Sequence, residues 1–138
     1  MMKLLNKTLP IAGVLALAGC VTLDQAVKDI QTATAPAVVK DTLPQICQAA
    51  KDNRVRANDF YVNKGLAISG EVLSINEGFQ PRYRVYIKAG KIAVHAGTEN
   101  QLAVKQLTVG RTASVTGTIT DVSYDYQGCS VALKDARF

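Results

Sequence analysis

The chain has 138 residues, of which 48% are hydrophobic, and a formal net charge of +5. This length allows one domain with short appendages. So mild a charge supports solubility, whereas a dedicated nucleic-acid binder is usually more basic and more clustered in its charge.

The first 19 residues have the features of an export signal. Lys3 and Lys7 form a positive segment, and the apolar run at 9–18 is shorter than the roughly 20 residues needed to cross a bilayer. The run ends in Leu17-Ala18-Gly19-Cys20, which resembles the lipobox of bacterial lipoproteins. The alternative is an ordinary signal peptide followed by a chance cysteine.

The lipobox resemblance implies that residues 1–19 are removed and that Cys20 carries acyl chains such as palmitate. These chains would anchor the protein to a membrane almost permanently. In Gram-negative lipoproteins an Asp after the cysteine tends to retain the protein in the inner membrane. Val21 stands there instead, which implies the outer membrane, facing the periplasm. The mature chain would keep 14 basic and 11 acidic residues, a net charge of +3.

The two other cysteines, Cys47 and Cys129, would then lie in an oxidising compartment. An even pair there more often forms a disulfide than stays reduced, so we expect a bridge. It would close a loop of about 80 residues and stabilise the fold by about 4 kcal/mol. The alternative is two buried thiols that never meet.

Residues 20–44 are expected to form the lipidated cysteine and a flexible tether, and residues 45–138 the folded domain. The domain should open with one helix of about 16 residues that is capped by Thr42 and ends near Gly65. Its inner face follows helical spacing and comprises Ile46, Ala50, Asn53, Ala57 and Tyr61.

Five strands follow, expected at 66–75, 82–89, 92–95, 111–122 and 129–138, with a short helix at 98–107 and a loop at 123–128. The first and fourth strands share a pattern in which Gly70 and Gly117 interrupt β-branched residues. Glycine inside a strand usually marks a bend, and two bent strands predict a small closed barrel. In the last strand, Val131, Leu133 and Asp135 should share one face.

This order predicts a mainly β domain, a five-stranded OB-fold Greek-key barrel with an N-terminal helix packed on it and a short helix between strands three and four. Residues 45–138 resemble the OB-fold lipoproteins of the tRNA_anti-like group. The likeness rests on Asn53, Ala57 and Tyr61 at four-residue steps, on Lys64-Gly65 and on the two glycine strands. The order Lys then Gly departs from the group's Gly then Lys. Such a fold does not by itself establish RNA binding.

The residues do not predict catalysis, a metal or a cofactor. His95 is the single histidine, and the three cysteines are assigned to lipid and to the bridge. The carboxylates are scattered, and no nucleophile motif or phosphate-binding glycine loop is present. We therefore expect a protein that is not an enzyme. The alternative is a hydrolase, whose turnover would be lost in the variant His95→Ala.

A binding surface is expected from the OB architecture, which uses strands two and three with the loops joining strands one to two and four to five. Aromatic and basic residues gather on these elements, as in grooves that stack bases or other flat groups. The candidate ligand-binding residues are Phe79, Arg82, Arg84, Tyr86, Lys88, Tyr124 and Tyr126. The alternative is that these cations only protect the sheet from aggregation.

The expected function is a non-catalytic, lipid-anchored envelope protein whose barrel binds a protein or an envelope polymer. One alternative is a surface-exclusion lipoprotein of a mobile element, which blocks related phages or plasmids. A second alternative is an oligonucleotide-binding module. Nucleic acid is the less favoured partner because a protein anchored outside the cytoplasm rarely meets it.

Overall fold

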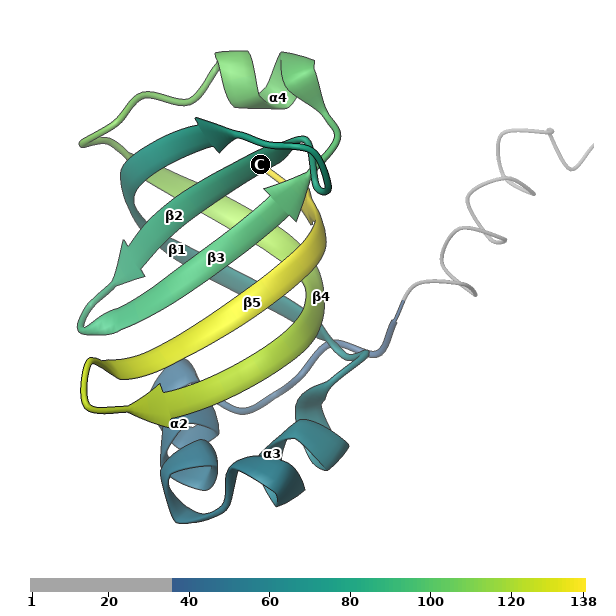
Figure 1. Ribbon diagram of the computed structural model, residues 1–138, viewed down its shortest axis with the longest axis vertical. Coiled ribbons are helices and arrows are strands. Elements are labelled where there is room, and N and C mark those ends of the chain that lie inside the picture. Colours follow the sequence, from purple (N-terminus) through teal and green to yellow (C-terminus); the bar gives the residue numbers. More distant parts are fainter. Residues whose placement is uncertain (1–35) are drawn as a thin grey trace, which may run out of the picture. The chain divides into compact units, whose positions relative to one another are not determined.

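The computed structural model describes residues 36–138, so the expected signal, the lipidation site Cys20 and most of the expected tether lie outside the described residues. Figure 1 shows a barrel with two helices at one end and a third helix at the other. The elements are α2 (Leu43–Asp52), α3 (Arg54–Tyr61), β1 (Gly65–Glu77), β2 (Tyr83–Ala89), β3 (Ile92–Thr98), α4 (Gln101–Lys105), β4 (Thr112–Asp125) and β5 (Gly128–Arg137).

The five strands close into a barrel in the order β1-β2-β3-β5-β4. Strands β3 and β5 run parallel, and every other neighbouring pair is antiparallel. The predicted five-stranded OB-fold, with a short helix between the third and fourth strands, is confirmed. Because the strands close into a barrel, most strand edges are paired with a neighbouring strand.

Strand β1 belongs to both halves of the barrel, which explains its glycine. Its first half pairs with β4 and its second half with β2, and Glu71 is paired with both. At Gly70 a Cβ atom would lie 2.5 Å from the backbone oxygen of Lys88. At Gly117 it would lie 3.0 Å from the backbone oxygen of Lys134. Both glycines therefore permit close approach of a neighbouring strand where the sheet curves.

The prediction of one long N-terminal helix is wrong, because the chain forms α2 and α3 with a break at Asn53. Asn53 has φ −162°, and its side-chain oxygen accepts a hydrogen bond from the backbone N–H of Arg56 at 3.0 Å. An asparagine that caps a new helix in this way satisfies the backbone without continuing the old one. Asn53 is consequently exposed and does not belong to the inner face.

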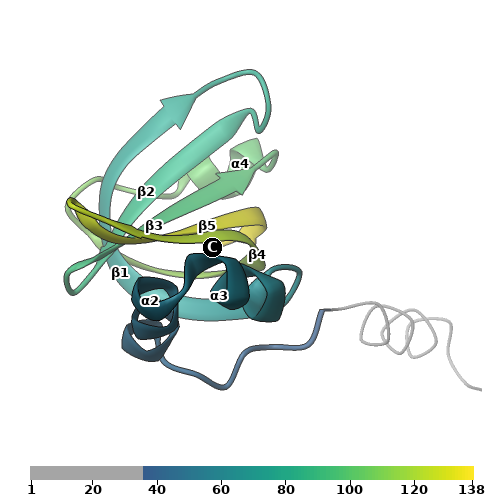
Figure 2. The same cartoon turned by 60° about the horizontal axis from the view of Figure 1, so that its bottom comes forward.

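The two helices cover one end of the barrel, as Figure 2 shows with that end brought forward. Ile46 and Ala50 of α2 and Ala57 and Tyr61 of α3 are buried in the same core as the strands, as expected. That core also contains Leu66, Val72, Tyr83, Val85, Ile87, Val94, Ala96, Val104, Val115, Ile119, Val122, Val131, Leu133 and Ala136. Most of these side chains occupy the inward-facing positions, which alternate with outward-facing positions along each strand.

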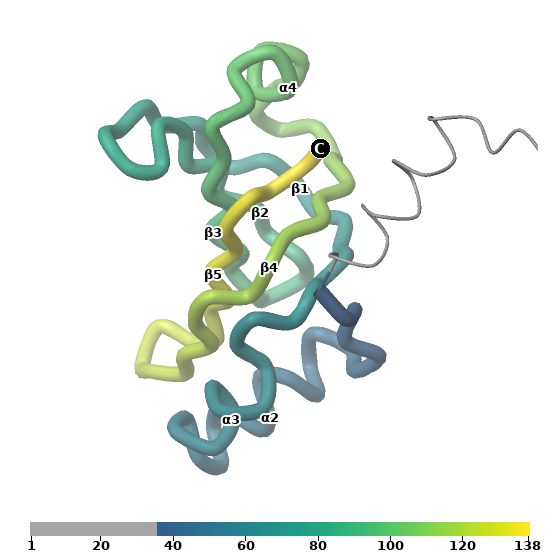
Figure 3. Tube along the Cα trace, turned by 90° about the vertical axis from the view of Figure 1, so that its right-hand side faces the viewer, coloured from purple at the N-terminus to yellow at the C-terminus, as the bar shows by residue number. Residues whose placement is uncertain are grey.

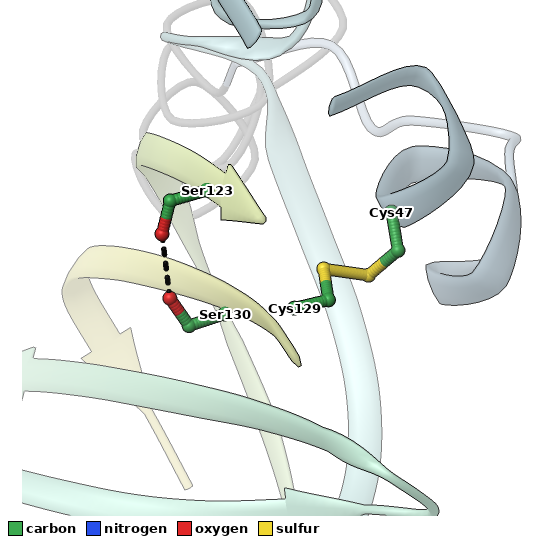
Figure 4. Close-up of a disulfide and its surroundings, with 4 residues drawn as sticks. All are labelled: Cys47, Ser123, Cys129 and Ser130. Atoms are coloured by element: carbon green, nitrogen blue, oxygen red, sulfur yellow. Dashed lines mark hydrogen bonds between the residues drawn. A yellow bond between two sulfur atoms is a disulfide. The ribbon is translucent and has the colours of Figure 1, made fainter. Parts of the chain in front are cut away.

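A disulfide joins α2 to the start of β5. Cys47 and Cys129 are bonded with an S–S distance of 1.96 Å across 82 positions of sequence. Figure 4 shows the bridge beside the Ser123–Ser130 hydroxyl pair, whose oxygens are 2.7 Å apart across β4 and β5. The two cysteines expected to pair are therefore in contact and bonded.

The segment before α2 is already part of the barrel. The N–H of Val39 donates to the carbonyl of Gly65 at 2.8 Å, and the N–H of Gly65 donates to the carbonyl of Ala37 at 2.9 Å. The Tyr61 hydroxyl donates to Asp41 at 2.7 Å. The folded domain thus begins before residue 45, the boundary expected from the sequence.

Two expectations at the C-terminal end need correction. The loop expected at 123–128 is a tight turn at Tyr126 and Gln127, because β4 and β5 pair as far as Asp125 and Gly128. Asp135 is exposed with φ +52°, and Ala136 takes the buried position. A shift of register between β4 and β5 breaks the two-residue alternation there, and a one-residue slip exchanges the faces.

The helix between β3 and β4 is shorter than expected. It spans Gln101–Lys105, and its cap is Asn100, whose side chain accepts from the N–H of Ala103 at 3.1 Å. Val104 is buried, whereas Leu102 is 74% exposed. Within residues 36–138, none of the helices has the length and apolar character required to cross a membrane.

Candidate functional site

A groove of about 510 Å³ lies on the outer side of β2, β3 and β5, the three strands that face the viewer in Figure 1. Its floor comes mainly from outward-facing strand positions, with Thr120 of β4 and the buried Thr98 and Leu133 also in the lining, and its rim comes from the β1–β2 loop and the segment after β3. It is lined by Gln80, Pro81, Arg84, Tyr86, His95, Gly97, Thr98, Glu99, Thr120, Ala132, Leu133, Lys134 and Asp135.

The centre of the groove is a pair of rings. Tyr86 of β2 and His95 of β3 are directly opposite in the antiparallel register, and their ring centroids are 4.7 Å apart with planes at 59°. Ala132 of β5 lies beside His95, and its small side chain leaves space next to the imidazole ring. Both rings are half-buried, so together they offer an aromatic surface that a flat or apolar group can contact.

His95 was not among the predicted ligand-binding residues, and this is the main residue that the sequence reasoning missed. The signal was nevertheless present. Gly90 and Lys91 form a tight turn between β2 and β3, so positions equally far from the turn must face each other. Counting back from that turn pairs Tyr86 with His95.

Arg84 forms one side of the groove. Its Nη2 donates to the backbone oxygen of Gln80 at 3.3 Å, which ties the strand to the β1–β2 loop. Burial of His95, with a further contribution from the positive charge of Arg84, lowers the pKa of the imidazole below its usual 6.5. His95 is therefore neutral at pH 7 and contributes a ring rather than a charge.

The remaining charges in the groove balance each other. Arg84 and Lys134 are basic, Glu99 and Asp135 are acidic, and neutral His95 adds nothing. Glu99 is held in place because its Oε1 accepts from the backbone N–H of Arg82 at 3.0 Å. The groove thus combines an aromatic centre with two positive and two negative side chains.

The β1–β2 loop is held against β3 by a close contact. At Gly97 a Cβ atom would lie 2.6 Å from Cγ of Pro81, so glycine lets the proline ring sit directly on the strand. Both residues line the groove, together with Gln80. The rim is therefore fixed by packing and by the Arg84 hydrogen bond, not by the loop alone.

The structure brings only some of the predicted ligand-binding residues together. Arg84 and Tyr86 line the groove. Lys88 follows on the same outward face of β2 but is not part of the lining. Arg82 is directed to Glu77, with Nε 3.5 Å from Oε1. Phe79, at 93% exposed, protrudes from the β1–β2 loop without lining the groove.

Tyr124 and Tyr126 lie at the other end of the barrel. Because β5 runs parallel to β3, the β4–β5 turn is at the end where β2 turns into β3, opposite the β1–β2 loop. Tyr126 is 93% exposed at that turn. The Tyr124 ring has the ammonium of Lys51 5.4 Å from its centroid. The two predicted aromatic loops therefore do not form one continuous surface.

Two further features bear on possible chemistry. The hydroxyl of Tyr83, which is 6% exposed on the inner side of β2, has no hydrogen-bond partner. Among residues 36–138, no three His, Cys, Asp or Glu side chains are grouped so that they could hold a metal ion.

No protein-family model matches this chain, and no curated protein matches its sequence at a significant level. The resemblance to the tRNA_anti-like group therefore stays a prediction. A solved structure of a lipoprotein from Klebsiella pneumoniae subsp. pneumoniae, provisionally described as nucleic acid-binding, superimposes with a TM-score of 0.53. It is 18% identical, and the match covers 79% of this chain and 95% of that one. At this identity the likeness concerns the fold alone.

A second solved structure, provisionally described as an aspartyl-tRNA synthetase of Leishmania major Friedlin, gives a TM-score of 0.34 at 13% identity. The match covers 83% of this chain but 26% of that one, so the chain spans about a quarter of the synthetase. A likeness this remote supports no inference.

Proposed function

We propose that this protein is a lipid-anchored envelope protein whose OB barrel is a non-catalytic binding module for a protein or an envelope polymer. The anchor is the acylated Cys20 in the outer membrane, and the binding surface is the groove on β2, β3 and β5. The lipobox at residues 17–20 supports the anchor. The overall likeness to a Klebsiella chain described as a lipoprotein is in keeping with it.

The observation that carries the binding role is the Tyr86–His95 pair inside a groove of balanced charge. A groove whose charges cancel gains little from releasing the counterions of a polyanion. It suits a partner that offers a flat or apolar group to the rings and polar groups of both signs to the rim. Protein surfaces and glycans with amide groups have this character.

The groove is tested by photo-crosslinking in cells. A photoreactive phenylalanine analogue is placed at Tyr86 and, as the matched control, at Tyr126, which is equally aromatic but outside the groove. We expect a defined protein or glycan adduct from position 86 that is absent from position 126. Adducts from position 126 alone, or equal adducts from both positions, would refute the assignment of the groove.

A second candidate ligand is single-stranded nucleic acid. Arg84 and Tyr86 line the same groove, a combination of cation and ring that can hold a stacked base, and the Klebsiella chain is provisionally described as binding nucleic acid. Fluorescence anisotropy with a labelled oligothymidine at low salt would then show binding that weakens as salt rises. The double variant Arg84→Ala/Tyr86→Ala should abolish it. No binding of the wild-type protein at low salt would eliminate this candidate.

The anchor is tested separately. Cells grown with a labelled fatty acid should incorporate the label into the wild-type protein and not into the Cys20→Ser variant. The Cys47→Ser variant serves as the control, because that cysteine is bonded to Cys129. Equal labelling of the wild type and Cys20→Ser would refute lipidation at Cys20.

A further inference from the structure

We propose that the outward side of α3, together with the N-terminal segment beside it, rests on the membrane leaflet that holds the anchor. This membrane-facing surface consists of Val38, Val55, Arg56, Asp59, Phe60 and Lys64. The proposal rests on the lipid anchor of the proposed function and adds an orientation of the barrel relative to the bilayer.

The surface lies where the described chain leads toward the anchor. The backbone of residues 37–39 pairs with Gly65, the residue at which β1 begins directly after α3. Fifteen residues separate Cys20 from Pro36. Even fully extended, they span at most roughly 50 Å, and the chain enters the described domain at the end of the barrel that carries α3.

The apolar members of the surface are exposed. Val38 is 65% exposed, Val55 72% and Phe60 55%. Val38 pairs through its backbone with Gly65, and the preceding Lys64 holds its ammonium 3.4 Å from the Phe60 ring centroid. These contacts place the N-terminal segment close to the end of α3 that carries Phe60, and Val55 lies near the start of the same helix.

Helix α3 presents this side because its other side is committed to the barrel. Ala57 and Tyr61 are buried, and Asn58 is half-buried with its side chain bonded to the backbone of Val122. At 100° per residue, the positions opposite them are 55, 56, 59 and 60. In these positions Val55 and Phe60 are accompanied by one base, Arg56, and one acid.

The charge of the surface suits a leaflet with anionic headgroups. Arg56 and Lys64 are basic, and Asp59 is the acid on the outward side of α3, which leaves a positive balance. On the outward side of α3, Arg56 and Asp59 lie between Val55 and Phe60, so the two apolar side chains can enter the headgroup boundary while Arg56 and the neighbouring Lys64 reach the phosphates.

The proposed orientation also leaves the other end of the barrel free. Figure 1 shows α3 at the end opposite α4, and Figure 3, turned by 90°, shows the same separation. The β1–β2 loop that forms the rim of the groove lies at the α4 end and so points away from the bilayer.

The test uses tryptophan fluorescence, because the chain contains no Trp. The full-length, lipidated protein is made as Phe60→Trp, as Val55→Trp and as the matched control Phe79→Trp, whose residue is 93% exposed at the opposite end. Each variant is incorporated into phosphatidylcholine–phosphatidylglycerol vesicles with brominated acyl chains, and flotation records attachment. We expect emission at positions 55 and 60 to be quenched at least twofold and shifted to the blue, and emission at position 79 to be unchanged.

The outcomes separate this proposal from the anchor itself. Protein that floats with the vesicles but shows no quenching at positions 55 and 60 overturns the membrane-facing surface and leaves the anchor in place. Quenching at position 79 equal to that at position 60 also overturns it. Protein that does not float overturns the anchor and, with it, the orientation proposed from it.

Discussion

Replacing Gly70 by alanine is the most direct test of how this barrel closes. A Cβ atom at this position would lie 2.5 Å from the backbone oxygen of Lys88 and 2.7 Å from a methyl carbon of Ile87. Both distances are shorter than any normal carbon contact, and a backbone oxygen inside a closed barrel cannot move away alone. The strands β1 and β2 must therefore separate, or β1 must change its bend.

Two other glycines supply a graded series. At Gly117 the nearest atoms would be 3.0 and 3.1 Å away, which a small shift can relieve, and at Gly78 the nearest would be 3.5 Å away, an ordinary contact. Overpacking typically costs 1–3 kcal/mol, so we expect Gly70→Ala to lose about 3 kcal/mol and Gly117→Ala about 1 kcal/mol. Gly78→Ala should be unchanged or slightly stabilised, because alanine restricts the unfolded chain.

The assay is urea unfolding followed by circular dichroism, supported by the melting temperature. For a domain of this size each 1 kcal/mol corresponds to a shift of about 4–8 °C, so Gly70→Ala should melt at least 10 °C below the wild type. If Gly70→Ala and Gly78→Ala have the same free energy of unfolding, the close approach of β1 and β2 at Gly70 is not real.

Three further predictions concern the bridge and two titrating rings. The double variant Cys47→Ser/Cys129→Ser should have a free energy of unfolding about 4.5 kcal/mol lower than that of the wild type, because the bridge spans 82 positions. An unchanged free energy of unfolding in denaturant would contradict a stabilising bridge. Burial and a carboxylate bond raise the pKa of Tyr61 to about 12, so stability should fall from pH 10 to 12 in wild type but not in Tyr61→Phe. By NMR, His95 should titrate below pH 6.5, and Arg84→Ala should raise its midpoint; an unchanged midpoint would contradict the Arg84 contribution.

The sign of the His95 effect on stability follows from its lowered pKa. As the pH falls through 6.5, the unfolded chain takes up a proton before the folded chain does. Stability attributable to this residue is therefore complete above pH 6.5 and declines in acid. The contribution of Tyr61 to stability has the opposite pH dependence, because it is complete below pH 10 and is lost as the pH rises toward 12.

Only part of the candidate site could be predicted from the sequence. Alternation along β2 placed Arg84 and Tyr86 on the outward side, and the structure puts both in the groove. His95 needed the register of the β2–β3 hairpin, and Glu99 needed the hydrogen bond that holds it at the rim. Tyr126 is predicted in the site because OB-folds bind through the loop joining strands four and five, but this turn is at the other end of the barrel from the rim of the groove.

Five strands, the short helix after the third strand and the glycines inside two of the strands are predictable from the residues alone, because alternation and turn residues are local properties of the chain. The sequence also indicated the pairing of Cys47 with Cys129 from their number and expected compartment. The break at Asn53 and the displacement of Asp135 by Ala136 could not be predicted in this way, because a cap and a shift of register depend on what packs against them. The composition of the groove also depends on closure, which brings β5, remote in sequence, beside the β2–β3 hairpin.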